Sequence, residues 1–105
     1  TGATLSDRAR EILILRIGWL CGAEYEWAQH VRVARRIGMS DDEIRRVASG
    51  ANASGWGPFE ATLIRAADEL PRDDTISGPT WRALTARYST AELIDVTSSL
   101  STRAA

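Results

Sequence analysis

The sequence predicts an all-α domain, a compact bundle of about five to six helices. Three observations support this class. Apolar residues recur three and four positions apart along most of the chain, which is the period of one helix face. Two Ser-x-x-Glu segments, Ser40–Glu43 and Ser89–Glu92, have the form of capping boxes that begin helices. No two adjacent segments alternate polar and apolar residues convincingly, as paired strands would.

The first helix is predicted from Ser6 or Asp7 to about Cys21, where Gly22 ends or kinks it. Its middle, Ile12–Ile17, is apolar on nearly every side, so a β-strand is the alternative there. The charged residues just before it favour a helix. A helix that is apolar all round must be covered on every side, which a domain of 105 residues can scarcely do alone. We therefore expect an oligomer.

The other helices are predicted from caps, chain breakers and apolar spacing. They span about 23–37, ended by Gly38; 40–48; 58–70, begun by Pro58 and broken by Pro71–Asp74; 77–88, begun by Ser77 or Gly78; and 89–101. Residues 49–55 form the main predicted loop. The polar tail, 98–105, is expected to fray.

Composition excludes several classes of function. The 105 residues suit a single domain, 1–105, and the formal net charge of −1 argues against nucleic-acid binding through a global field. All thirteen basic residues are arginine, which excludes a Schiff-base lysine. The single Cys21 allows no internal disulfide or paired-cysteine zinc site, and the single His30 allows no multi-histidine site within one chain. We therefore expect no metal.

Membrane and secretory classes are not indicated either. The longest apolar run, Ile12–Ala23, is interrupted by Arg16 and is shorter than the ~18 residues that span a bilayer. The chain opens without the basic flank of a signal peptide. We expect a cytoplasmic protein without a membrane partner. The absence of lysine and the many alanines suggest a GC-rich bacterial genome.

The strongest candidate for chemistry is the pair Glu26 and His30. Four residues apart on a helix, the two side chains share a face and lie within hydrogen-bond reach. A carboxylate that accepts from one imidazole nitrogen fixes the tautomer and presents the other nitrogen for proton transfer. The alternative is a structural histidine that its glutamate satisfies where two helices pack.

Two charged residues in the first helix are further candidates. Glu11 lies at the start of the apolar run, either in a solvated turn, which its residue type favours, or as a carboxylate aimed into a pocket. Arg16 interrupts the run, so it either pairs with an acid structurally or binds a substrate carboxylate.

The remaining special residues favour structural roles. Cys21 has no second cysteine near it and follows an apolar pair, so we expect a buried small side chain rather than a redox thiol. The four tryptophans are expected as core or interface anchors, and Trp56 alone, in a Gly-rich loop, is expected to line a pocket. Asp73 and Asp74 lack convergent ligands and read as a solvated turn.

Seven parts of the chain form one combined pattern: Arg10–Arg16, Gly22–His30, Ala34, Gly38–Ser40, Glu43–Ile44, Ala67–Leu70 and Thr80–Leu84. Together they resemble the carboxymuconolactone decarboxylase family, which shares its fold with the alkylhydroperoxidase D-like proteins. The similarity covers about 10–96. It implies an all-helical fold that assembles as a homotrimer or homohexamer.

The redox branch of that family carries a glutamate, a Cys-x-x-Cys pair and a histidine in fixed order. The resemblance places the glutamate on Glu11 and the histidine on His30, but the two thiol positions fall on Ala23 and Glu26. The chain thus resembles the branch that lacks the cysteine pair, and thiol peroxidase chemistry, which Cys21 alone would have to support, is the disfavoured alternative.

The branch without the thiols includes the decarboxylase itself, whose reaction needs no cofactor. The resemblance implies a lyase for a small carboxylated or lactone-like substrate, with Glu11, Glu26 and His30 as the acid–base residues. Arg16 and Trp27 would hold the substrate's carboxylate or lactone oxygen. A non-catalytic oligomeric module is the remaining alternative, and the fold alone does not identify the substrate.

Overall fold

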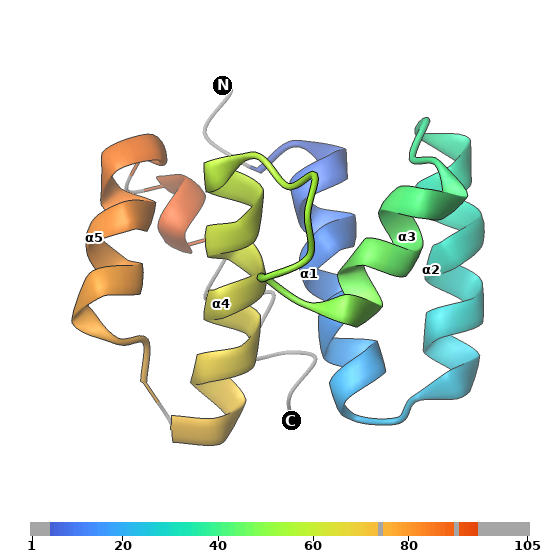
Figure 1. The fold of residues 1–105 in the computed structure, drawn as a ribbon, viewed down its shortest axis with the longest axis horizontal. Helices are drawn as coiled ribbons and strands as arrows, with labels where there is room; N and C mark the ends of the chain where they lie inside the picture. Colours follow the sequence, from blue (N-terminus) through green and yellow to red (C-terminus); the bar gives the residue numbers. More distant parts are fainter. Residues whose placement is uncertain (1–4, 74, 90, 95–105) are drawn as a thin grey trace.

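The structure, a computed structural model, describes residues 5–73, 75–89 and 91–94. Across these residues it contains five helices and no strand (Figure 1). The helices are α1 (Asp7–Leu20), α2 (Glu24–Arg36), α3 (Asp41–Ser49), α4 (Pro58–Asp73) and α5 (Gly78–Arg87). Residues 91–94 are helical as well. The predicted all-α class is confirmed, and Ile12–Ile17 is helix rather than strand.

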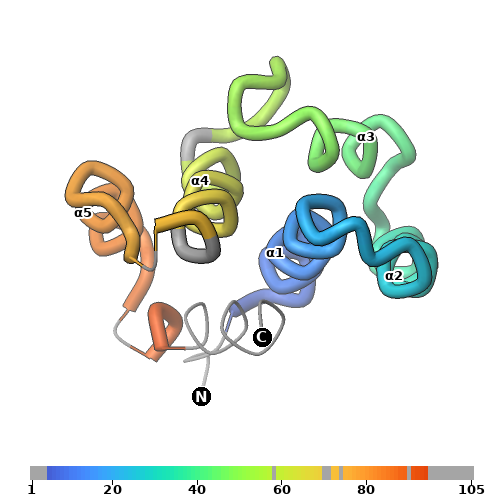
Figure 2. The backbone as a smooth tube through the Cα atoms, turned by 90° about the horizontal axis from the view of Figure 1, so that it is seen from below, coloured from blue at the N-terminus to red at the C-terminus, as the bar shows by residue number. Residues whose placement is uncertain are grey.

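The helices α5, α4, α1 and α2 lie side by side in that order, as seen along their axes in Figure 2. The short helix α3 covers one side of α1 and α2, and residues 91–94 lie on the opposite side of the row. The helix α1 is therefore the central element, in contact with three others. The most apolar helix therefore packs against more neighbouring helices than the others do.

Side-chain caps begin the helices where the sequence predicts them. The Ser6 hydroxyl accepts from the backbone N–H of Ala9 at 3.1 Å, and the Ser77 hydroxyl accepts from that of Thr80. Both predicted capping boxes form. The Ser40 and Ser89 hydroxyls each accept from the backbone three residues on, and the glutamate there accepts from the N–H of the serine.

The predicted end of the fourth helix is wrong. The helix continues through Pro71 to Asp73. Proline removes its own N–H and crowds the carbonyl four residues earlier, but the residues after it keep their N–H groups, so one more short stretch of helix can form. The predicted sixth helix is described only at 91–94; its remainder and the tail 98–105 lie outside the described residues.

The expectation that one chain cannot cover its first helix is wrong for the middle of that helix. Ile12, Leu13 and Leu15 are completely buried within the single chain, because α2, α3 and α4 enclose the middle of α1. The core is completed mainly by α4, through Leu63 and Ile64. Burial of these side chains contributes roughly 1.5–3 kcal/mol each. The middle of α1 is thus covered without a partner subunit, whereas Trp19 and Leu20 near its end are 52% and 46% exposed.

None of the described helices is both long and apolar enough to cross a bilayer.

Candidate active site between α1 and α2

The helices α1 and α2 form an antiparallel hairpin around a tight turn. The turn is closed by the backbone N–H of Ala23, which donates to the Gly18 carbonyl at 2.9 Å. Gly22 adopts a φ of 66°, a left-handed conformation that side chains with a Cβ rarely take. The glycine therefore permits the sharp reversal that lays α2 back along α1.

The hairpin brings Glu11 and His30 together. His30 Nδ1 lies 2.7 Å from Glu11 Oε1, although the two residues are 19 positions apart. The side chains are largely buried, with 9% of Glu11 and 19% of His30 exposed. A carboxylate is seldom buried without a partner, and here the imidazole provides it.

This geometry fixes how the imidazole can act. An ionised Glu11 accepts a hydrogen bond from the Nδ1–H of His30, which leaves the lone pair of the neutral ring on Nε2. Nε2 has no hydrogen-bond partner among the described residues. Every fully buried side-chain nitrogen or oxygen in that part of the chain does have a partner, so Nε2 is not fully buried. Nε2 is thus the atom from which a proton can be exchanged with a ligand or solvent.

The predicted partner of His30 was the wrong glutamate. The sequence expectation paired it with Glu26, on the same helix, but Glu11 of the neighbouring helix makes the hydrogen bond and Glu26 is exposed. The solvated interpretation of Glu11 is wrong as well, because α2 covers this turn of α1. The position assigned to Glu11 by the family resemblance agrees with the buried carboxylate that the structure shows.

One signal in the sequence could have identified the Glu11–His30 pair. In an antiparallel hairpin, residues equally far from the turn face each other. Glu11 lies nine residues before the last residue of α1, and His30 lies six residues after the first residue of α2. The difference is less than one helical turn, so the two residues become candidates for contact once the helices are assumed to pack back to back.

Arg16 points away from this pair, toward α3 and α4. Its Nε donates to Asp68 at 2.7 Å, and its Nη1 donates to the carbonyls of Val47 and Ala48 at 3.0 and 2.8 Å. Only 11% of the side chain is exposed. Of the two roles that the sequence allowed, these contacts favour the structural ion pair, which also satisfies the last carbonyls of α3.

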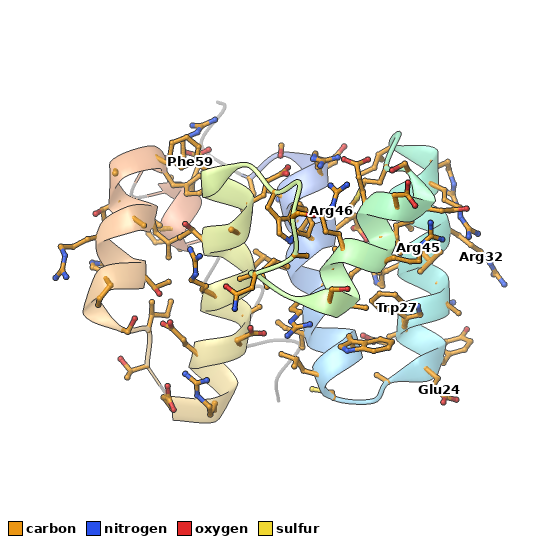
Figure 3. All side chains as sticks on the ribbon, viewed as in Figure 1. Glu24, Trp27, Arg32, Arg45, Arg46 and Phe59 are labelled. Atoms are coloured by element: carbon orange, nitrogen blue, oxygen red, sulfur yellow. The ribbon has the colours of Figure 1, made fainter. Side chains whose placement is uncertain are left out.

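Trp27 lines a surface cleft of about 280 Å³ at the end of the hairpin, together with Trp19, Glu24 and the small residues of the turn. Figure 3 shows Trp27 on the side of α2 toward α1, with Glu24 at the end of the helix below it. The cleft and the Glu11–His30 pair both lie along the interface between α1 and α2, which we call the α1–α2 seam. They are separated by about two turns of α1, or roughly 10 Å.

The structure also shows the surroundings of three further residues that the sequence singled out. Cys21 is exposed rather than buried, because it caps the end of α1 in the turn. Trp56 is partly buried, and its indole N–H donates to the Gly50 carbonyl at 3.0 Å beneath the Arg46 guanidinium. These contacts hold the loop between α3 and α4 in place. Asp73 is exposed and pairs with Arg72, while Asp74 lies outside the described residues.

Among the residues that the structure places, no three His, Cys, Asp or Glu side chains are arranged to hold a metal ion.

Comparison with known protein families identifies the family of this chain. The model of the carboxymuconolactone decarboxylase family matches residues 2–69, which include α1, α2, α3 and most of α4. The chain therefore belongs to this family. No curated protein and no solved structure matches the chain significantly.

Proposed function

We propose that the protein is a cofactor-independent lyase that acts on a small carboxylated or lactone-like substrate by acid–base chemistry. The observation that carries this proposal is the buried hydrogen bond between Glu11 and His30, which directs Nε2 of the imidazole outward. Family membership supports a relation to decarboxylases of this type.

The proposed reaction is the loss of CO2 from a substrate carboxylate. The electron pair of the broken C–C bond can then delocalise into a lactone carbonyl. The C–C bond breaks, CO2 leaves, and the electrons remain as a dienolate. A protonated His30 then transfers the Nε2 proton to carbon, and Glu11 stabilises the imidazolium before this transfer. Water returns the proton to Nε2. Glu26 is proposed as the second acid near His30, and the Trp27 indole N–H as a donor to the substrate's oxygen.

A thiol peroxidase is less well supported. Its usual disulfide needs a second thiol, and the chain has only Cys21. The positions of the family's thiol pair hold Ala23 and Glu26, so Cys21 would have to react with another molecule.

Self-association is proposed as well, as the homotrimer or homohexamer that the family resemblance implies. Large apolar side chains are exposed on α4 and α5, at Phe59 and Trp81. These side chains are available to a second copy and are separate from the α1–α2 seam. A cytoplasmic location is proposed with it.

The test is an assay of CO2 release with carboxymuconolactone and a panel of carboxylated lactones. In D2O the product should carry one deuterium at the dienolate carbon that His30 protonates, next to the lactone carbonyl. We expect H30Q to lower kcat/KM by about 10²- to 10⁴-fold, the usual contribution of a general acid. We expect E11Q and E26Q to lower it by smaller factors, E11Q through misorientation of the ring.

Two control variants complete the assay. Q29A removes an exposed side chain from the same helix and should leave the rate unchanged. C21S should also retain activity, because the proposed step uses no thiol. Full activity in a folded H30Q variant would rule out the proposed role of His30, and a peroxide-consuming activity abolished by C21S would support the redox alternative.

A further inference from the structure

The cleft at the end of the α1–α2 hairpin has the composition of a small-molecule site. Two indole rings form it, with Trp19 and Trp27 centroids 5.4 Å apart and their planes inclined by 56°. Trp19 is 52% exposed, an unusual amount for so large an apolar side chain. The volume, about 280 Å³, is close to the lower end of the ~300–1,000 Å³ typical of ligand pockets.

Small residues keep the cleft beside the indoles open. Gly18, Gly22 and Ala23 contribute almost no side-chain volume to the lining. A Cβ built on Gly22 would meet no atom within 4 Å, so this residue faces open space. The concave shape therefore follows from the sequence, which places glycine and alanine between two tryptophans at a helix turn.

The charge at the rim of the cleft is negative. Glu24 lines the cleft at the start of α2. The N-terminus of a helix contributes about +0.5 of a charge, which is smaller than the full charge of this carboxylate. Among the described residues, the carboxylate of Glu24 has no ion-pair or hydrogen-bond partner, so its charge is available to a ligand.

We infer that this cleft is a binding site for a flat apolar ligand with a cationic end. The indole faces offer stacking area and a negative π surface, which favours a cation as well as a ring. The Glu24 carboxylate would accept the charged end at the rim. This inference goes beyond the proposed proton transfer, since binding in the cleft does not require Glu11 and His30 to be catalytic.

The tryptophans provide a site-resolved experiment. Each of the four indole N–H groups gives one cross-peak in a ¹⁵N–¹H spectrum, and Trp→Phe variants assign them. The probes are tryptamine, indole and indole-3-acetate, which share a ring system and differ in charge. We expect the Trp19 and Trp27 peaks to shift and those of Trp56 and Trp81 to stay in place. Two-ring fragments in a half-open cleft should bind with Kd on the order of 1 mM.

The order of affinities tests the charge. Tryptamine should bind about three- to tenfold more tightly than indole-3-acetate, because an exposed carboxylate has a modest effect in water. The variant E24Q should bring the two affinities within about twofold of each other. W19A should weaken all three probes at least about fivefold, whereas W81A, which removes an exposed tryptophan on α5, should change none of them.

Three outcomes would overturn the inference. The first is equal shifts at Trp56 or Trp81, which would indicate non-specific binding. The second is an absence of shifts at Trp19 and Trp27 up to about 10 mM probe. The third is movement of these peaks with protein concentration instead of probe, which would mean that a second copy covers the cleft. The Trp56 peak, held by its bond to Gly50, reports that each variant remains folded.

Discussion

His30 and Glu11 form the one contact between imidazole and carboxylate that the described residues contain, and it joins two different helices. Their atoms are 2.7 Å apart because the turn at Gly22 lays α2 antiparallel along α1. The pair therefore depends on the hairpin and not on the helical spacing within α2. Any change that alters the turn should therefore alter the pair. Variants of the pair and variants of the turn test the two features separately.

Stability should reveal the coupling between Glu11 and His30. We expect E11Q and H30Q each to lower the free energy of unfolding by about 1–3 kcal/mol, because each leaves a largely buried partner imperfectly paired. The double variant should lose less than the two losses combined, with a coupling of about 0.5–3 kcal/mol. Urea unfolding of all four proteins at pH 7 measures these values.

The matched control is Q29A, which alters an exposed side chain on the same helix and should change the free energy of unfolding by less than about 0.5 kcal/mol. Strictly additive losses in E11Q and H30Q would show that the pair makes no energetic contribution.

Local signals predicted the helices well. The Ser40 and Ser89 capping boxes, the Ser6 and Ser77 caps and the glycine after α2 all act within a few residues, so they are visible without knowledge of packing. Pro71 was misjudged because its effect depends on how many residues follow it in the helix.

The site was harder to predict because it depends on packing between helices. The spacing of Glu26 and His30 is a property of one helix, whereas the Glu11–His30 bond requires the path of the turn. Exposure of Cys21 and Trp19 likewise depends on where α1 ends relative to its neighbours. The family resemblance supplied what the local pattern lacked, since it marked Glu11 and His30 together.

Replacement of Gly22 should weaken the hairpin. In G22A the alanine would have to adopt the left-handed backbone conformation at a φ of 66°, which its Cβ disfavours. We therefore expect a loss of about 1–2 kcal/mol in the free energy of unfolding. Space is not the cause, because a Cβ there meets no atom within 4 Å.

The matched variant is G57A, where a Cβ also meets open space and no left-handed φ is required. It should be neutral or slightly stabilising, because alanine restricts the unfolded chain. Thermal unfolding followed by circular dichroism compares the two, and equal losses would contradict the role assigned to Gly22.

The ion pair of Arg16 with Asp68 should be the most sensitive polar contact outside the proposed site. Removal of the guanidinium in R16M leaves Asp68 and the carbonyls of Val47 and Ala48 without their donor. We expect a loss of about 2–4 kcal/mol, somewhat below the figure for a fully buried pair because Asp68 is partly exposed.

The exposed pair of Arg72 and Asp73 provides the comparison. R72Q should cost less than about 0.5 kcal/mol, because surface ion pairs contribute little. Midpoints of urea unfolding measure both variants, and a loss in R16M no larger than in R72Q would show that Arg16 does not brace α3 against α4.

Glu43 connects a helix cap to an ion pair, and this makes it sensitive to pH. Arg8 donates a hydrogen bond to its carboxylate, and the Ser40 backbone N–H donates another. The Arg8 hydrogen bond, followed by that of Ser40, lowers the pKa of Glu43 from its ordinary 4.5 to about 2. Arg8 also binds Glu60, so the arginine links α1, α3 and α4.

Because folding lowers this pKa, Glu43 stabilises the protein fully above its unfolded pKa, and the contribution is lost as the pH falls from about 5 to about 2. We expect E43Q to lower the free energy of unfolding by about 1 kcal/mol at pH 7. The difference from the parent protein should remain constant down to about pH 5 and shrink toward pH 2.5.

Urea unfolding of both proteins at several pH values isolates this carboxylate from the others. In an R8M background the pH-dependent part of the difference should be smaller and should be complete at a higher pH, because the main cause of the lowered pKa is absent and the folded pKa lies closer to 4.5. A difference that stays the same between pH 7 and pH 2.5 would show that the charge of Glu43 does not stabilise the fold.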